Sequence, residues 1–251
     1  MELEHNEQLS DVKHLDSLIE KTKLLKQEIG KIIIGQEDII EQVLISIFSK
    51  GHCLLVGVPG LAKTLLVNTI AQALGLTYNR IQFTPDLMPS DITGNEVLDE
   101  NRKFKFIKGP IFANIILADE INRTPPKTQA ALLEAMQEKS VTISGVTNKL
   151  EEPFFVLATQ NPIEQEGTYP LPEAQLDRFM FMLWLDYPNF DEEVNILKST
   201  TTGKVVEVNT VFSKADITLM QDLIKKLPVA DNVYEYAVKL VEKTRVSTPK
   251  A

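Results

Sequence analysis

The sequence predicts an α/β fold: a parallel β-sheet between helices, with β-hairpin inserts and a small, mostly helical part after it. Strand-like apolar runs alternate with helix-periodic segments along most of the chain, which is typical of a parallel sheet covered on both faces. One such unit is a short apolar strand at 53–56, a glycine-containing loop at 57–64 and a helix-periodic segment after it. After Pro188 the strand signal fades and helical patterns dominate.

Two helices are expected before this unit. The first covers 11–29, where apolar residues recur on one face and Gly30 provides the stop. The second opens at Gly35-Gln36 and buries apolar residues spaced by three and four positions. The later strands of the sheet are expected at Tyr78–Phe83, Ile115–Ala118, Phe154–Thr159 and Phe179–Leu185.

A further helix is expected at Pro126–Glu138, with Thr124 as its N-cap and Pro125 near its first turn. Two segments interrupt the alternation and have the pattern of hairpins. One spans 95–107 with its turn at 99–101, and the other spans 141–150 with its turn at Ser144-Gly145. Surface decoration and a functional role are equally compatible with these hairpins.

The loss of strand signal predicts a domain boundary near Pro188. It divides the chain into a core with an N-terminal helix at 1–188, which contains the glycine-containing loop, and a helical lid at 189–251. The lid is expected to be a shortened one, with helices at 191–198, 215–226 and 232–245.

Composition excludes several classes of protein. The chain has 251 residues, 43% of them apolar, so it can bury a sizeable core. Its formal charge of −9 argues against a nonspecific nucleic-acid binder. The N-terminus is acidic where a signal peptide is basic, and no apolar stretch approaches membrane-spanning length, so a cytoplasmic location is expected.

The cysteine and the histidines do not suggest a disulfide or a metal centre. Cys53 is the single cysteine, and its place in a predicted strand favours a buried, inert thiol. His5, His14 and His52 have no metal-ligand spacing and are expected to be surface residues or incidental.

The loop at 57–64 has the pattern of a phosphate-binding loop. Its backbone N–H groups and the start of the following helix can surround a polyphosphate. Lys63 can reach the β- and γ-phosphates, and the Thr64 hydroxyl can hold Mg²⁺. Ala62 stands where the pattern G-x-x-x-x-G-K-[ST] has its second glycine. The expected nucleotide-binding residues of this segment are Gly57, Val58, Pro59, Gly60, Leu61, Ala62, Lys63, Thr64 and Leu65.

Acidic and amide side chains follow two of the predicted strands. Asp119 and Glu120 end one strand, at the edge where an open parallel sheet presents its ligands. Asp119 is expected to hold the Mg²⁺ shell, and Glu120 to polarise the attacking water. Asn161 follows the next strand, and its amide can contact a γ-phosphate and orient water. The alternatives are an acidic cap for the next segment and a plain Asn-Pro turn.

Arg178 lies just before the last strand of the sheet. It either remains solvated or paired on its own surface, or is supplied to the nucleotide of a neighbouring subunit.

Taken in order, these residues resemble the AAA+ ATPases and, within them, the MoxR family, over about residues 20–190. The resemblance rests on a specific set of stretches: Ile34–Gln36, Gly57–Thr64, Phe83–Leu87, Asp119–Arg123, Ala158–Pro162 and Gln165–Pro172. An Ala-Lys-Thr ending of the phosphate loop is similar to that of the subgroup that contains MoxR proteins, magnesium-chelatase ATPase subunits and MCM helicases.

The resemblance implies roles for several residues. Asn161 matches sensor 1, Arg178 matches the arginine finger, and Gly35 and Gln36 would lie near the adenine. The hairpins match a helix-2 insert within 91–109 and a pre-sensor-1 hairpin at 140–151. The family uses ATP and Mg²⁺, forms rings that are generally hexamers, and is thought to remodel or activate protein clients, with von Willebrand factor A domain proteins as frequent partners.

The C-terminus departs from the family pattern. The family's lid carries a sensor 2 arginine in a Gly-Ala-Ser-Pro-Arg-Ala-like stretch, whereas this chain ends in Val-Ser-Thr-Pro-Lys-Ala at 246–251. Either Lys250 takes the place of that arginine, or the segment is unrelated to it.

Two classes of function are compatible with these features. The first is a ring-forming ATPase that hydrolyses ATP to ADP and phosphate and acts on protein clients. The second is a DNA-dependent motor, which only the lysines near the first hairpin and the related MCM helicases favour and which the acidic composition opposes. A third option, an ATP-binding switch without turnover, conflicts with the presence of Glu120.

Overall fold

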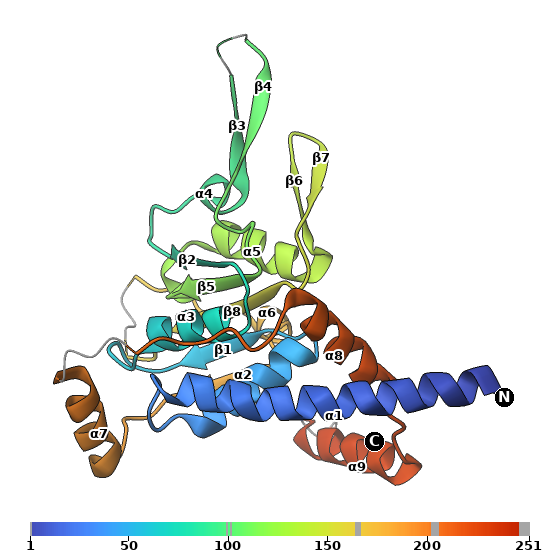
Figure 1. Ribbon diagram of the computed structural model, residues 1–251. Coiled ribbons are helices and arrows are strands. Elements are labelled where there is room, and N and C mark those ends of the chain that lie inside the picture. Colours follow the sequence, from blue (N-terminus) through green and yellow to red (C-terminus); the bar gives the residue numbers. More distant parts are fainter. Residues whose placement is uncertain (1, 99, 101, 164–166, 202–205, 246–251) are drawn as a thin grey trace, which may run out of the picture.

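The computed structural model describes residues 2–98, 100, 102–163, 167–201 and 206–245, with side chains from residue 11 onward (Figure 1). The turn predicted at 99–101 and the segment 246–251 with Lys250 therefore lie wholly or partly outside the described residues. Among the described residues, no helix combines the length and the apolar character that crossing a membrane requires.

A five-stranded parallel sheet forms the centre of the molecule, as the alternating pattern predicted. Its strand order is β2-β5-β8-β1-β9, and every neighbouring pair is parallel. The strands are β1 (Cys53–Val56), β2 (Tyr78–Gln82), β5 (Ile115–Asp119), β8 (Phe155–Gln160) and β9 (Phe181–Trp184). Because their carboxyl ends share one edge, the residues that follow β1, β5 and β8 are brought together there.

Successive strand residues point to opposite faces, so the sheet has two apolar clusters. Leu55 and Leu157 join the cluster under the helices α1 (Glu2–Gly30), α2 (Glu37–Phe48) and α3 (Lys63–Ala73). Leu54 and Val156 join the opposite cluster with the helix α5 (Pro126–Glu138). Both clusters are almost fully buried, which fixes the register of the strands.

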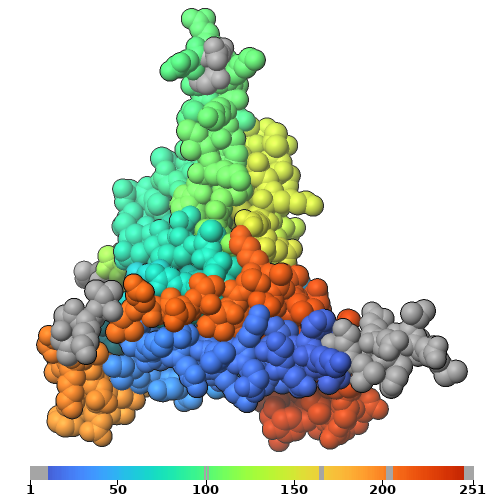
Figure 2. Space-filling model, in the orientation of Figure 1, coloured from blue at the N-terminus to red at the C-terminus, as the bar shows by residue number. Residues whose placement is uncertain are grey.

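Two antiparallel hairpins project from the same side of the molecule, the first following the short helix α4 (Pro89–Thr93) (Figures 1 and 2). They pair β3 (Gly94–Leu98) with β4 (Phe104–Lys108), and β6 (Ser140–Ile143) with β7 (Val146–Lys149). Ser144 and Gly145 both have positive φ, which confirms the predicted tight turn of the second hairpin. At the base of the first, a Cβ on Gly94 would lie 2.1 Å from the Ile107 carbonyl oxygen, so only glycine fits.

The C-terminal part contains the helices α7 (Phe190–Thr201), α8 (Lys214–Lys226) and α9 (Asp231–Thr244). Of these, α8 packs onto the first apolar cluster through Ile217 and Leu223, beside α1 and α2 (Figure 1). Gln221 Nε2 also donates a hydrogen bond of 2.8 Å to the Ile47 carbonyl of α2. The domain boundary near Pro188 stays a prediction, because α8 shares its core with the N-terminal helices.

Two local predictions are wrong. Thr124 does not cap α5, because Pro125 holds the N-cap position and the Thr124 hydroxyl donates instead to the Thr84 carbonyl at 2.9 Å. His52 is neither a surface residue nor incidental: it is 8% exposed and bonded between α5 and β8. Cys53 is buried as expected, and burial raises the pKa of its thiol to about 11.

Candidate active site

The phosphate loop connects the end of β1 to the first residue of α3, which is Lys63. Gly57 donates its N–H to the Gln160 carbonyl at 3.1 Å, which ties the loop to β8. A Cβ at Gly57 would lie 3.0 Å from Leu185 Cβ, so the loop lies tightly against the segment after β9. Gly60 has φ 91°, a conformation that glycine adopts at little cost.

Ala62 has a left-handed backbone, with φ 54° and ψ 24°. This residue stands where the phosphate-loop pattern has its second glycine, and the conformation explains why that position favours glycine. Alanine is tolerated there at a cost of about 1–2 kcal/mol.

The loop and the acidic pair open onto one cavity of about 460 Å³. The predicted residues that line it are Pro59, Gly60, Leu61, Ala62, Lys63, Thr64, Leu65, Asp119, Glu120 and Asn161. Residues from three separate strands and a helix terminus thus converge, which the sequence pattern predicted. Arg80 and Gln82 of β2 line the same cavity and were not predicted.

Lys63 lies inside this cavity with its ammonium folded back toward the loop. Its Nζ donates a short hydrogen bond to the Gly57 carbonyl oxygen. Burial lowers the pKa of Lys63, and the nearby charges of Asp119 and Glu120 oppose that shift.

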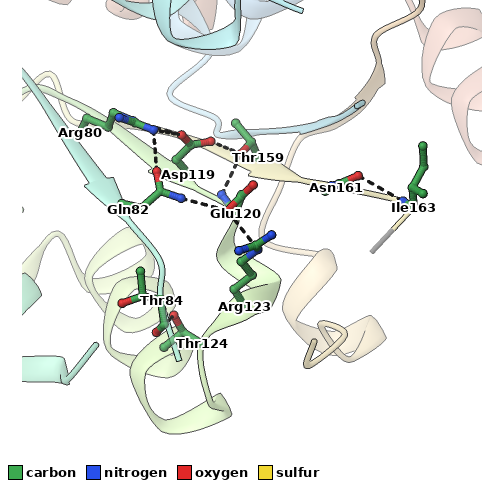
Figure 3. Close-up of polar contacts among 10 residues, drawn as sticks. All are labelled: Arg80, Gln82, Thr84, Asp119, Glu120, Arg123, Thr124, Thr159, Asn161 and Ile163. Atoms are coloured by element: carbon green, nitrogen blue, oxygen red, sulfur yellow. Dashed lines mark hydrogen bonds and ion pairs between the residues drawn. The ribbon is translucent and has the colours of Figure 1, made fainter. Parts of the chain in front are cut away.

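Both oxygens of the Asp119 carboxylate are engaged (Figure 3). Thr159 of β8 donates its hydroxyl to Oδ1 at 2.6 Å. Arg80 donates to Oδ2 from Nε at 3.0 Å and from Nη2 at 2.6 Å. The side chain of Asp119 is 15% exposed, so it is fixed in a largely buried position at the cavity wall.

Glu120 has a left-handed backbone with φ 59° and ψ 50°. Its N–H donates to the Thr159 hydroxyl at 2.8 Å, so one threonine positions both members of the acidic pair. Gln82 Nε2 donates to Glu120 Oε2 at 2.9 Å, and Arg123 Nε lies 3.1 Å from the same oxygen (Figure 3). A strained non-glycine residue at the end of a central strand is typical of a functional position.

Asn161 follows β8, which is the neighbour of β5 in the sheet. It is buried, and its Oδ1 accepts the Ile163 N–H at 3.2 Å (Figure 3). The predicted proximity of Asn161 to the acidic pair is therefore found, because both line one cavity.

Gly35 and Gln36 lie at a second cavity, of about 470 Å³, together with Leu185, Tyr187 and Glu192. Gln36 Nε2 donates to the Leu61 carbonyl at 3.4 Å, which connects this cavity to the phosphate loop. Gly35 has φ 75°, and a Cβ there would lie 2.3 Å from Glu192 Cδ of α7. The C-terminal part therefore packs directly against the Gly35-Gln36 turn.

Arg178 is half-buried and is not one of the described residues that line either of these cavities. Its Nη1 donates to the Leu133 carbonyl of α5 at 2.7 Å. The structure thus places this arginine away from the acidic pair of its own chain.

The donor set at the phosphate loop suits Mg²⁺. This ion takes one or two protein oxygens together with phosphate and water oxygens, and Thr64 and Asp119 supply oxygens in the same cavity. Within the described part of the chain, no group of three or more His, Cys, Asp or Glu residues forms a metal site. An ion held jointly by a nucleotide therefore fits, whereas a protein-only cage does not.

Arg80 and Gln82 lie outside the phosphate-loop and acidic motifs, but their spacing on β2 could have indicated their place in the site. They occupy alternate positions near the end of β2, and Gln82 lies directly opposite Asp119 in the strand register. Because side chains alternate between the two faces of a sheet, Arg80 and Gln82 lie on the same face as Asp119.

Comparison with known proteins places the chain in a family. Residues 52–181, just over half of the chain, match the model of the ATPase family associated with various cellular activities (AAA). YeaC of Bacillus subtilis is 48% identical over 221 residues, which cover 87% of this chain and 69% of YeaC. The chaperone MoxR1 of Mycobacterium tuberculosis is 47% identical over 87% of this chain and 58% of MoxR1.

A solved structure from Cytophaga hutchinsonii, of a protein assigned as an ATPase, superposes with a TM-score of 0.86 at 46% identity. The match covers 98% of this chain and 73% of that one. The chain thus spans about three fifths to three quarters of these relatives. With the phosphate loop, acidic pair and hairpins in their places, the chain belongs to the MoxR family of AAA+ ATPases.

Proposed function

We propose that this chain binds Mg-ATP in the 460 Å³ cavity and hydrolyses it to ADP and phosphate. The observation that carries this proposal is the single cavity onto which Lys63, Asp119 and Glu120 all open. A phosphate-binding cation and a pair of carboxylates within one cavity are the parts that phosphoryl transfer to water requires.

Lys63 and the start of α3 bind the β- and γ-phosphates. The Lys63 ammonium exchanges the Gly57 carbonyl for phosphate oxygens, and the free N–H groups at the start of α3 are further donors for the same anion. Thr64 and Asp119 hold Mg²⁺, which when bound neutralises charge that develops on the phosphate oxygens.

Glu120 accepts a proton from the attacking water, and Asn161 orients that water or the γ-phosphate without adding charge. Glu120 is available for this step once its carboxylate turns from Gln82 and Arg123 toward the cavity. Gly35 and Gln36 bind the adenine side of the nucleotide, at the cavity that Gln36 joins to the loop.

We further propose that the protein works as a ring, with a hexamer as the expected size. Family membership supports a ring, and the position of Arg178 outside its own site fits an arginine supplied to the next subunit.

Protein clients are the proposed targets of the ring. One relative is named a chaperone, and the β3–β4 hairpin carries exposed apolar side chains suited to a polypeptide, Phe104 at 72% and Leu98 at 56%. Proteins with von Willebrand factor A domains are candidate partners from the resemblance alone. The DNA-motor alternative is not favoured, because the chain has a formal charge of −9 and the relative with 47% identity is named a chaperone.

The test is Glu120→Gln, which keeps the size of the side chain and removes its basicity. ATP affinity should stay within about twofold of wild type, whereas phosphate release should fall by about 10²-fold or more. Glu20→Gln, at an exposed position of α1, is the matched control and should hydrolyse ATP normally. A Glu120→Gln protein that turns over ATP at the wild-type rate would rule out the assigned base.

A further inference from the structure

Arg80 is a cation inside the candidate active site that the phosphate-loop and acidic motifs do not explain. It lies on β2, lines the 460 Å³ cavity, and has a side chain 47% exposed. Besides its two bonds to Asp119 Oδ2, its Nη2 donates to Gln82 Oε1 at 2.5 Å. The guanidinium is therefore oriented by two partners, one of which is the proposed metal ligand.

These contacts place the positive charge of Arg80 at Asp119, where the positive charge of Mg²⁺ is also expected. Oδ1 of Asp119 already accepts from Thr159, and Oδ2 carries both bonds from Arg80. A metal, or a water bound to it, that uses Asp119 must share an oxygen with Thr159 or Arg80. An arginine stays protonated at every physiological pH, so this competition cannot be relieved by loss of its proton.

We propose that Arg80 competes with Mg²⁺ for Asp119 and so sets the metal concentration at which the nucleotide site loads. The inference rests on the proposed function, since it assumes that Asp119 faces the metal of a bound nucleotide. Arg80 is a positioning residue: it acts through Asp119. When the metal binds, Gln82 still holds one nitrogen of the guanidinium, so Arg80 needs only to release Asp119.

The experiment measures metal binding without turnover. The protein is saturated with the non-hydrolysable analogue AMP-PNP and titrated with Mn²⁺, while free Mn²⁺ is followed by electron paramagnetic resonance. Arg80→Gln and Arg80→Met both remove the charge and should lower the half-saturating Mn²⁺ concentration by about five- to tenfold. Arg80→Lys keeps the charge and should stay closer to wild type than either neutral variant.

Lys23→Gln is the control. It also removes one positive charge, but at an exposed position of α1 that does not line the cavity, so it should leave the Mn²⁺ titration unchanged. The proposal would be overturned if the half-saturating Mn²⁺ concentration stayed the same or rose in both neutral variants. Arg80 would then have no effect on metal binding or would favour it. Tightening in Lys23→Gln as large as in Arg80→Gln would also overturn it. A wild-type protein that binds no AMP-PNP with Mn²⁺ would instead reject the proposed function itself.

Discussion

Two non-glycine residues with left-handed backbones flank the candidate active site, Ala62 at φ 54° and Glu120 at φ 59°. Each lies where the chain leaves a strand or enters a helix beside the cavity. Surrounding packing must compensate for such conformations, and the residues around Glu120 show how: Thr159 accepts its N–H while Gln82 donates to its carboxylate. The strained backbones at these two positions thus help to orient the phosphate loop and the acidic pair toward the cavity.

At Ala62, replacement by glycine should relieve the left-handed strain. The gain of about 1–2 kcal/mol is partly offset by the greater freedom of glycine in the unfolded chain, so Ala62→Gly should change the free energy of unfolding by about 0 to +1 kcal/mol. Ala130→Gly, at an exposed position of α5, is the control and should lose about 1 kcal/mol. Urea unfolding of both variants measures the contrast, and equal losses would show that Ala62 is unstrained.

At the scale of elements, His52 connects the strand β1 to its neighbours. The residue precedes β1, its Nδ1 accepts the Val156 N–H at 3.0 Å, and its Nε2 lies 3.4 Å from the Met136 carbonyl near the end of α5. These partners require a neutral ring with the proton on Nε2. The side chain therefore joins β1, β8 and α5 in one uncharged contact.

This contact predicts a pH-dependent stability. Burial lowers the pKa of His52 to about 4, below its usual value of 6.5. Between these values the unfolded chain binds a proton that the folded chain does not, so the free energy of unfolding falls as the pH falls. The whole contribution is about 3 kcal/mol, present above pH 6.5 and lost by pH 4.

Urea unfolding between pH 7 and pH 4.5 measures this effect. His52→Gln should flatten the dependence relative to wild type, while His14→Gln, at an exposed position of α1, should keep it. An unchanged slope in His52→Gln would assign the acid sensitivity to other groups.

What could be predicted from sequence depended on how local the signal was. The phosphate loop, the acidic pair and the four later strands follow from short patterns, and the structure contains them all. Arg80 and His52 could not be assigned, because their partners lie 39 and 104 positions away and depend on which strands are neighbours. Thr124 failed as a cap because a distant carbonyl took its hydroxyl.

At the scale of the whole molecule, the central sheet separates the hairpins from the C-terminal helices. The two hairpins stand out from one side of the body, while α7, α8 and α9 lie at the opposite side of the sheet (Figure 1). Lys226 of α8 also pairs with Asp11 of α1 at 2.8 Å, and Lys21 with Asp216 at 2.8 Å. These contacts and the shared apolar cluster join the first helix to α8.

If each active site is shared between two subunits of a ring, two inactive variants should complement each other. Arg178→Ala keeps a complete pocket but lacks the proposed arginine, and Glu120→Gln keeps the arginine but lacks the base. Each variant alone should bind ATP and release phosphate at least about 10²-fold more slowly than wild type. Mixed in equal amounts, they should regain activity, because about a quarter of the pockets in a random ring combine an intact base with an intact neighbouring arginine.

The control for this mixture pairs Arg178→Ala with the double variant Arg178→Ala/Glu120→Gln, which supplies no arginine and must stay inactive. Arg178→Ala also loses the hydrogen bond to the Leu133 carbonyl, so its thermal unfolding and ATP affinity are measured first to show that it is folded. A loss of about 1 kcal/mol from that bond leaves the pocket usable. If the complementary mixture is as inactive as the control mixture, Arg178 does not act across a subunit boundary, and its bond to α5 is its whole role.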